Sequence, residues 1–177
     1  MKEIRLHGRG GQGIVTSAEV IVYAASEDNL FAACFPYFGF EKKGGPVAAF
    51  VRIDESKIRE KCQIYEPDCV VIVDPTVVTV ASTVFDGLKE NGIVVMNCSD
   101  PASYSFPRSA SKVGAVDANA ISREVLGRVL PNTVMLGAFA KVTGWVDKDK
   151  LAARTAEIWG EKNKQAVLRG YEETRLI

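Results

Sequence analysis

The sequence predicts an α/β protein with one doubly wound, mostly parallel sheet and helices on both of its faces. Apolar periods switch repeatedly between strand-like and helix-like along the chain. Several strand candidates are also nearly continuous in apolar residues, as strands covered on both faces are. No linker composition, repeat or low-complexity tract interrupts the 177 residues, so we expect a single domain over residues 1–177.

The expected elements follow one another in alternation. The strand candidates are short and rich in β-branched residues, and they cover residues 4–6, 46–53, 69–73, 93–97 and 113–116. Helical spacing predicts helices over residues 14–25, 77–90, 118–129 and 147–171. Asn91-Gly92 is a typical signal for the end of the second helix, and Gly160 predicts a break in the last. Residues 35–46 are expected to form a long loop, and loops of that length are usually functional or mobile.

Three of the strand candidates end in a polar residue, namely Asp74, Asn97 and Asp117. Ligands of open α/β sheets bind outside the carboxyl ends of the strands, so this edge as a group is a candidate to face a cofactor or partner. Taken singly, each residue is better explained as the cap of the next helix or the start of a turn.

Charge and cysteine usage exclude several classes of function. Lysine and arginine number 22, as do aspartate and glutamate, so the basic surplus typical of nucleic-acid or anionic-membrane binding is missing. The chain shows no signal peptide and no apolar run that could span a bilayer, which predicts a cytoplasmic protein. Its four cysteines lack the compact spacing of a metal site and are expected to be buried free thiols.

A glycine-rich run follows the first strand candidate and opens onto a helix: Gly8, Arg9, Gly10, Gly11, Gln12 and Gly13. The run matches G-x-G-x-x-G, the fingerprint of Rossmann-like dinucleotide sites, which is a weak signal when it stands alone. Such a site also needs an acidic residue about 20 positions further on, at the end of the second strand. Glu27 and Asp28 lie at the end of the helical segment instead, and Asp54 comes after a long insertion. A stand-alone NAD-dependent oxidoreductase therefore stays an alternative, whereas the tight-turn role of the glycines holds in either case.

A second informative segment lies between the first helix and the second strand candidate. It contains four aromatic residues within six positions, followed by two lysines and two glycines: Phe35, Tyr37, Phe38, Phe40, Lys42, Lys43, Gly44 and Gly45. These residue types favour an interface with an anion or a neighbouring chain. The alternative is an aromatic lid over the sheet with solvated lysines.

The two motifs together resemble a known family. The glycine run, then residues 36–45 from Pro36 to Gly45, then Val51-Arg52-Ile53 are similar in order and kind to the gamma subunit of the 2-oxoacid:ferredoxin oxidoreductases. The pyruvate and oxalate enzymes belong to this group, and the similarity covers nearly the whole chain. One departure is Lys43, where the family usually has an arginine; a lysine keeps the charge but not the bidentate fork.

The resemblance implies a complex that oxidatively decarboxylates a 2-oxoacid and passes electrons to ferredoxin. Thiamine diphosphate, Mg²⁺ and the [4Fe–4S] clusters would then lie on alpha-, beta- and delta-type partner subunits, and this chain would not be catalytic alone. In members that use coenzyme A, the equivalent domain is implicated in binding it and in closing over the active site. Because the oxalate-type members need no acyl acceptor, a coenzyme A contact is conditional.

These arguments define the candidate site. The residues expected to face the active site or a cofactor are Gly8, Arg9, Gly10, Gly11, Gln12, Gly13, Glu41, Lys43, Gly44 and Gly45. No catalytic or metal-binding residue is assigned, and His7 is expected to be a packed or capping residue. A purely structural assembly subunit is a further alternative, and the sequence does not identify the 2-oxoacid.

Overall fold

The computed structural model describes residues 1–38, 44–80 and 82–177. Within these ranges the strands form one seven-stranded sheet in the order β2-β3-β1-β4-β5-β6-β7. The strands are β1 (Lys2–Arg9), β2 (Phe31–Phe38), β3 (Pro46–Asp54), β4 (Cys69–Ile72), β5 (Gly92–Asn97), β6 (Ala110–Val116) and β7 (Arg175–Leu176). The four central strands, β1, β4, β5 and β6, run parallel, whereas β2, β3 and β7 pair antiparallel at the two sides. The predicted mostly parallel α/β sheet is confirmed.

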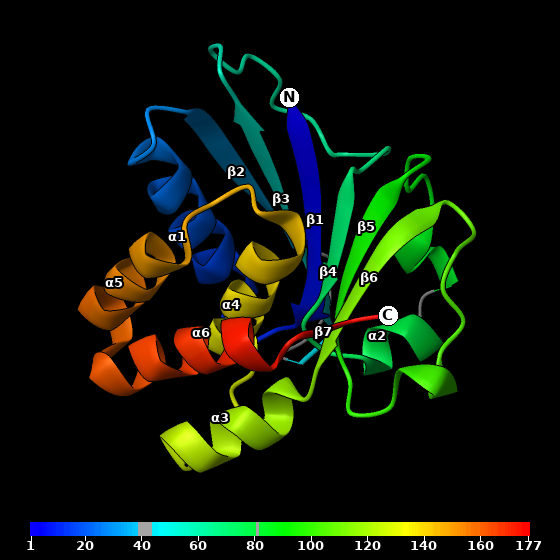
Figure 1. The fold of residues 1–177 in the computed structure, drawn as a ribbon. Coiled ribbons are helices and arrows are strands. Elements are labelled where there is room, and N and C mark those ends of the chain that lie inside the picture. Colours follow the sequence, from blue (N-terminus) through cyan, green and yellow to red (C-terminus); the bar gives the residue numbers. More distant parts are fainter. Residues whose placement is uncertain (39–43, 81) are drawn as a thin grey trace.

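The long helices gather on one side of the sheet (Figure 1). They are α1 (Ile14–Ser26), α4 (Asn132–Thr143), α5 (Lys148–Trp159) and α6 (Glu161–Glu173), with α3 (Ala118–Leu126) packed against α4 and α6. In the described ranges, the helical segments on the other side are short, namely α2 (Thr76–Val80) and the 3₁₀ turns η1 (Ser82–Phe85) and η2 (Pro101–Ser103). Helical cover is therefore very unequal on the two faces. Among the described residues, no helix has the length and apolar character needed to cross a membrane.

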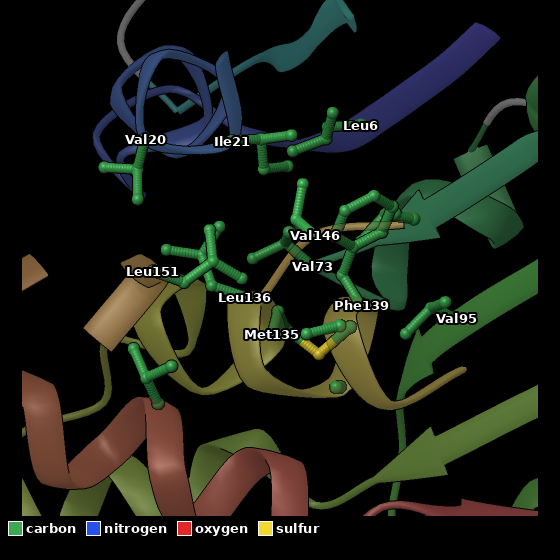
Figure 2. Close-up of a cluster of buried hydrophobic side chains, with 14 of the residues drawn as sticks. Leu6, Val20, Ile21, Val73, Val95, Met135, Leu136, Phe139, Val146 and Leu151 are labelled. Atoms are coloured by element: carbon green, nitrogen blue, oxygen red, sulfur yellow. The ribbon is translucent and has the colours of Figure 1, made fainter. Parts of the chain in front are cut away.

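The main core lies between the sheet and α4. Figure 2 shows Met135, Leu136 and Phe139 of α4 among apolar side chains from the sheet and from neighbouring helices. All three are essentially buried, and so are ten of the twelve residues of this helix. An α-helix that is apolar on every side can only be stable inside the protein, and α4 occupies such a position.

Three parts of the sequence fold differently from expectation. The predicted helix over residues 77–90 is wrong: α2 ends at Val80 after a run of β-branched residues, which favour helices poorly, and Asn91 with a φ of 63° forms a turn before β5. The predicted loop is wrong for residues 35–38, which belong to β2. The helix α4 was not expected at all.

Candidate functional site at the carboxyl edge of the sheet

The glycine loop connects the end of β1 to the start of α1 in a tight turn. Gly13 has a φ of 73°, and a Cβ atom there would lie 2.6 Å from Nδ2 of the buried Asn132. At Gly8 a Cβ atom would lie 2.4 Å from Cδ1 of Ile14. Gly11 and Gly13 both have positive φ angles that glycine adopts without strain, so the expected tight-turn role of the glycines is confirmed.

Gln12 folds back over the loop and joins it to the next parallel strand. Its Oε1 accepts a hydrogen bond from the backbone N–H of Arg9 at 2.8 Å, and its Nε2 donates to Oδ2 of Asp74 at 2.6 Å. The other oxygen of Asp74 accepts from the backbone N–H and the hydroxyl of Thr76. Burial opposes ionisation of Asp74, but the bonds from Thr76 and Gln12 and the charge of Arg9 lower its pKa overall. The ends of β1 and β4 are thus bridged by side chains.

Arg9 lies at the centre of this edge. Its Nε donates to the hydroxyl of Thr76 at 2.7 Å and lies 3.8 Å from Oδ2 of Asp74. Its Nη1 donates to the carbonyl oxygen of Gly44 at 3.2 Å. The side chain remains about 29% exposed, so the guanidinium is held in place and still reaches solvent.

The two glycine motifs meet at this point of the fold. The N–H of Gly10 donates to the carbonyl oxygen of Gly45 at 2.9 Å, and Arg9 bonds to Gly44 as described above. The cause is the antiparallel pairing of β1 with β3, which places Arg9 opposite Pro46. Two segments more than 30 positions apart in the sequence therefore form one surface. Glu41 and Lys43, which were predicted to belong to it, lie outside the described residues.

A groove opens beside the loop. It has a volume of about 420 Å³ and is lined by Arg9, Gly10, Gly11, Gly13, Ile14, Val15, Thr16 and Val47. The start of α1 lies in this lining, and its cap residue Gly13 has no side chain to bond the first N–H groups. Free N–H groups, a positive helix end and one guanidinium favour a negatively charged group.

The candidate carboxylates in the described part of the chain are not where a dinucleotide site requires them. Because β3 runs antiparallel to β1, Asp54 lies at the opposite edge of the sheet, where its carboxylate pairs with the N-terminal ammonium of Met1 at 2.9 Å. Asp28 follows α1 and forms an ion pair with Lys150. Neither carboxylate is placed at the glycine loop to bind a ribose, and the geometry gives the NAD alternative no support.

The remaining polar strand ends hold the edge together. Asp117 accepts a hydrogen bond from the N–H of Ala120 and caps α3, as expected. Asn97 bonds the carbonyl oxygen of Val73 and the N–H of Ala118. These contacts tie the ends of three parallel strands to the start of a helix.

Burial keeps the side chains of His7 and Cys69 uncharged. The Nε2 atom of His7 is buried and finds no hydrogen-bond partner within the described residues, and burial followed by the charge of Arg5 lowers its pKa to about 3. A packed or capping histidine was expected, and His7 is packed. Burial also raises the pKa of the Cys69 thiol, whereas Cys62 is exposed and departs from the expected burial. Among the residues that the structure describes, no three His, Cys, Asp or Glu side chains are grouped as a metal site would need.

Comparison with known proteins decides the family. The family model described as pyruvate ferredoxin/flavodoxin oxidoreductase matches residues 3–173. The chain belongs to this family. The expected resemblance is confirmed, and the chain is a gamma subunit of a multi-subunit pyruvate or 2-oxoacid:ferredoxin oxidoreductase.

Relatives of this gamma subunit match over their whole length. Pyruvate synthase subunit PorC of Methanothermobacter thermautotrophicus is 49% identical, with 98% of this chain and 96% of the relative covered. The common gamma subunit of the pyruvate/ketoisovalerate oxidoreductases of Pyrococcus abyssi is 43% identical, with 100% and 99% covered. The crystal structure of the PORC subunit of Thermotoga maritima has a TM-score of 0.86 at 32% identity, with 99% and 97% covered.

A more distant structure shows the same fold inside a longer chain. The 2-oxoglutarate:ferredoxin oxidoreductase of Magnetococcus marinus matches with a TM-score of 0.73 at 21% identity, covering 97% of this gamma subunit but 30% of that chain.

The structure adds Asp74 and Thr76 to the candidate site. Taken singly, Asp74 was expected to start a turn or cap a helix, but together with Thr76 it also holds Gln12 and Arg9. The signal available was the position of Asp74 at a strand end, on the same edge as the glycine loop.

Proposed function

We propose that the glycine loop and the Gly44–Gly45 turn form the surface with which this gamma subunit closes and shapes the active site of its complex. Alpha-, beta- and delta-type subunits would hold thiamine diphosphate, Mg²⁺ and [4Fe–4S] clusters. The complex would decarboxylate a 2-oxoacid oxidatively in the cytoplasm and pass the electrons to ferredoxin.

The observation that carries this proposal is the meeting of the two glycine motifs around Arg9. The carboxyl edge of the parallel strands, where ligands of α/β sheets bind, carries the glycine turn and the N-terminus of α1. It also carries the guanidinium of Arg9, which is hydrogen-bonded and still partly exposed. A purely structural subunit would not need a cation positioned by three separate contacts at that edge.

The groove beside the loop offers groups that could bind the phosphates of coenzyme A. The cofactor carries phosphate groups, and the groove offers Arg9, the unbonded N–H groups at the start of α1, and backbone without side chains at Gly10 and Gly11. Arg9 would bind a phosphate, and the loop backbone would orient it. This part of the proposal applies only if the complex uses coenzyme A.

In a complex without coenzyme A, the same residues would act on the active site itself. Thiamine diphosphate, when bound by the partner subunits, supplies the electron sink for decarboxylation. The glycine loop would exclude water from that site, and Arg9 would place a fixed positive charge near the carboxylate of the 2-oxoacid.

Turnover of the assembled complex tests the proposal. An Arg9→Met variant removes the guanidinium and is expected to lower kcat/KM by about 10- to 100-fold, the usual effect of losing one charge-assisted hydrogen bond. The matched control is Arg128→Met, because Arg128 is exposed and lies far from the loop in sequence. Both complexes are assayed with pyruvate, other 2-oxoacids and oxalate, using a viologen dye as acceptor, with and without coenzyme A.

The pattern of kinetic changes distinguishes the two contacts. A rise in KM for coenzyme A alone supports phosphate binding, whereas a fall in kcat with every substrate supports the active-site role. Unchanged turnover in a fully assembled Arg9→Met complex would overturn the proposal and leave assembly as the function of this chain.

A further inference from the structure

Four aromatic side chains share one face of the β2–β3 pair, on the side of the sheet opposite the long helices. Residues of a strand alternate between the two faces, so Phe31, Phe35 and Tyr37 of β2 lie on one face. Phe50 of β3 lies opposite Phe35 and therefore on the same face, and its ring centroid is 6.2 Å from that of Tyr37. We call these four residues the aromatic face.

The aromatic face is incompletely covered by the chain itself. Phe31 and Tyr37 are each 48% exposed. The alternate residues Ala32 and Cys34 pack against the main core on the helical side. Within the described ranges, neither apolar core cluster includes any of the four aromatic residues, although a second cluster covers the same side of the sheet over β4, β5 and β6.

The crossover segment between β3 and β4 is bound on this side of the sheet by two arginines, one of which, Arg52, lies opposite Ala33 between Phe31 and Phe35. Arg52, on β3, donates to the carbonyl oxygens of Cys62 and Gln63, and Arg5, on β1, donates to that of Ile64. These two buried guanidiniums hold residues 62–64 over β1 and β3. The chain therefore buries Phe50 and anchors residues 62–64 on this side of the sheet, and it leaves Phe31 and Tyr37 half exposed.

Pairing of a second strand along the outer edge of β2 is disfavoured. Pro36 lies in the middle of this edge strand, opposite Ala49 of β3. A proline has no N–H group to donate to an added strand, and prolines are a common means of blocking edge-to-edge association. An occupant has to pack on the face of the strands rather than extend the sheet.

The size of the aromatic face argues against a dimer of this chain held by that face alone. A fully buried aromatic side chain covers about 150–250 Å², so two half-exposed rings offer on the order of 200 Å². A stable interface needs about 800 Å² from each partner. The face is large enough only as one part of a wider contact.

That wider contact is available at the adjoining edge. Tyr37 and His7 both lie opposite Ala48, and Arg9 lies opposite Pro46 two positions further along the same strands. The aromatic face thus runs directly into the glycine loop, which the proposed function places against the partner subunits.

We propose that a non-identical subunit of the same complex docks on the aromatic face through an apolar surface, in one interface that continues to the glycine loop. Phe31 and Tyr37 are the anchors of this contact, and the inference rests on the proposed function for the direction from which the partner approaches. Half-exposed aromatic residues that become buried are the usual centres of binding energy in an interface.

Competition during assembly tests the proposal. Wild-type and Tyr37→Glu gamma subunits are co-expressed with the other subunits, and their ratio in the purified complex is compared by mass spectrometry with their ratio in the unassembled pool. We expect the variant to be depleted roughly tenfold or more, since a charge is buried at an anchor position. Tyr23→Glu is the matched control, because Tyr23 is 38% exposed on α1, and it should be incorporated within about twofold of wild type.

Two further measurements keep the result interpretable. The thermal midpoint of isolated Tyr37→Glu should equal that of wild type, because the side chain is half exposed, and Phe31→Glu provides a second variant if it does not. Sedimentation of the isolated wild-type chain reports self-association, and a dimer abolished by Tyr37→Glu would overturn the proposal in favour of a second copy.

Equal incorporation of both face variants would likewise overturn the docking proposal. This outcome is separate from failure of the proposed function, because Arg9→Met complexes that assemble normally and turn over normally refute the active-site role without affecting the aromatic face.

Discussion

The side of the sheet that lacks long helices has two halves that are built differently. Over β4, β5 and β6, buried residues such as Ile72, Val94 and Met96 pack against Val77 of α2 and Leu88 after η1. Over β1, β2 and β3, the buried Arg5 and Arg52 anchor the irregular residues 62–64, and Phe31 and Tyr37 are left half exposed. The first half completes its own core, and the second depends on polar anchors and, by our proposal, on a partner.

Topology explains the difference. Parallel strands need crossover connections, and those between β4, β5 and β6 pass over this side of the sheet with α2, η1 and η2. The antiparallel pair β2–β3 needs no crossover between its own strands, and among the described residues the part of the chain bound over this side of it is residues 62–64, held by Arg52 and Arg5. Antiparallel pairs at the side of an α/β sheet are for this reason natural places for an external contact.

The largest loss of stability is expected from substitutions over β4, β5 and β6, where the chain completes its own core. Met96→Ala removes a fully buried side chain from β5 and should lower the free energy of unfolding by about 2–5 kcal/mol. Tyr37→Ala, in the open half, should cost less than about 1 kcal/mol in the isolated chain. Urea unfolding of both variants checks the contrast, and equal losses would contradict the division into two halves.

The second-largest loss of stability is expected from removing Arg52, which anchors residues 62–64. Arg52→Met leaves the carbonyl oxygens of Cys62 and Gln63 without their donor and removes the 2.9 Å bond to Glu3, although Lys89 still pairs with that carboxylate. We expect a loss of about 2–4 kcal/mol, because a buried pair is broken from one side. Arg52→Lys keeps the charge but not the fork and should recover only part of it, in the same unfolding assay. Full stability of Arg52→Met would show that residues 62–64 do not need this anchor.

The contribution of His7 to the free energy of unfolding should change little near neutral pH and fall clearly in acid. Its pKa is about 3 in the folded chain and about 6.5 in an unfolded one, so the unfolded state takes up the proton first as the pH falls. Stability from the neutral imidazole is complete above pH 6.5 and declines by about 1.4 kcal/mol per pH unit below it, reaching about 2 kcal/mol at pH 5.

The matched measurement for His7 is a pH series of urea unfolding on wild type and His7→Gln. The amide does not titrate, and His7 is the single histidine of the chain, so the difference between the two curves isolates its contribution. Parallel curves between pH 7 and pH 5 would mean that His7 is accessible to protons in the folded state.

Sequence reasoning predicted the fold class and the pairing of the two glycine motifs, but it missed β2 and α4. The meeting of Gly8–Gly13 with Gly44–Gly45 could be expected from the paired motifs. The strand β2 was missed because Pro36 and the glycines that follow it are typical of loops, whereas the alternation of Phe31, Phe35 and Tyr37 marks a strand. The helix α4 was missed because its residues are apolar on every side and give no amphipathic period, although Pro131 before it and Gly144 after it are end signals.

Side-chain footprinting of the intact complex tests the central claim most directly, since hydroxyl-radical oxidation of aromatic residues reports their exposure. Oxidation of Phe31 and Tyr37, relative to Tyr23 on the helical side, is compared between the isolated gamma subunit and the complex. If a partner subunit completes the open half of the sheet, both rates fall at least about threefold in the complex while that of Tyr23 is unchanged, in keeping with the loss of water at an interface core. Unchanged oxidation of Phe31 and Tyr37 in a fully assembled complex would contradict the account.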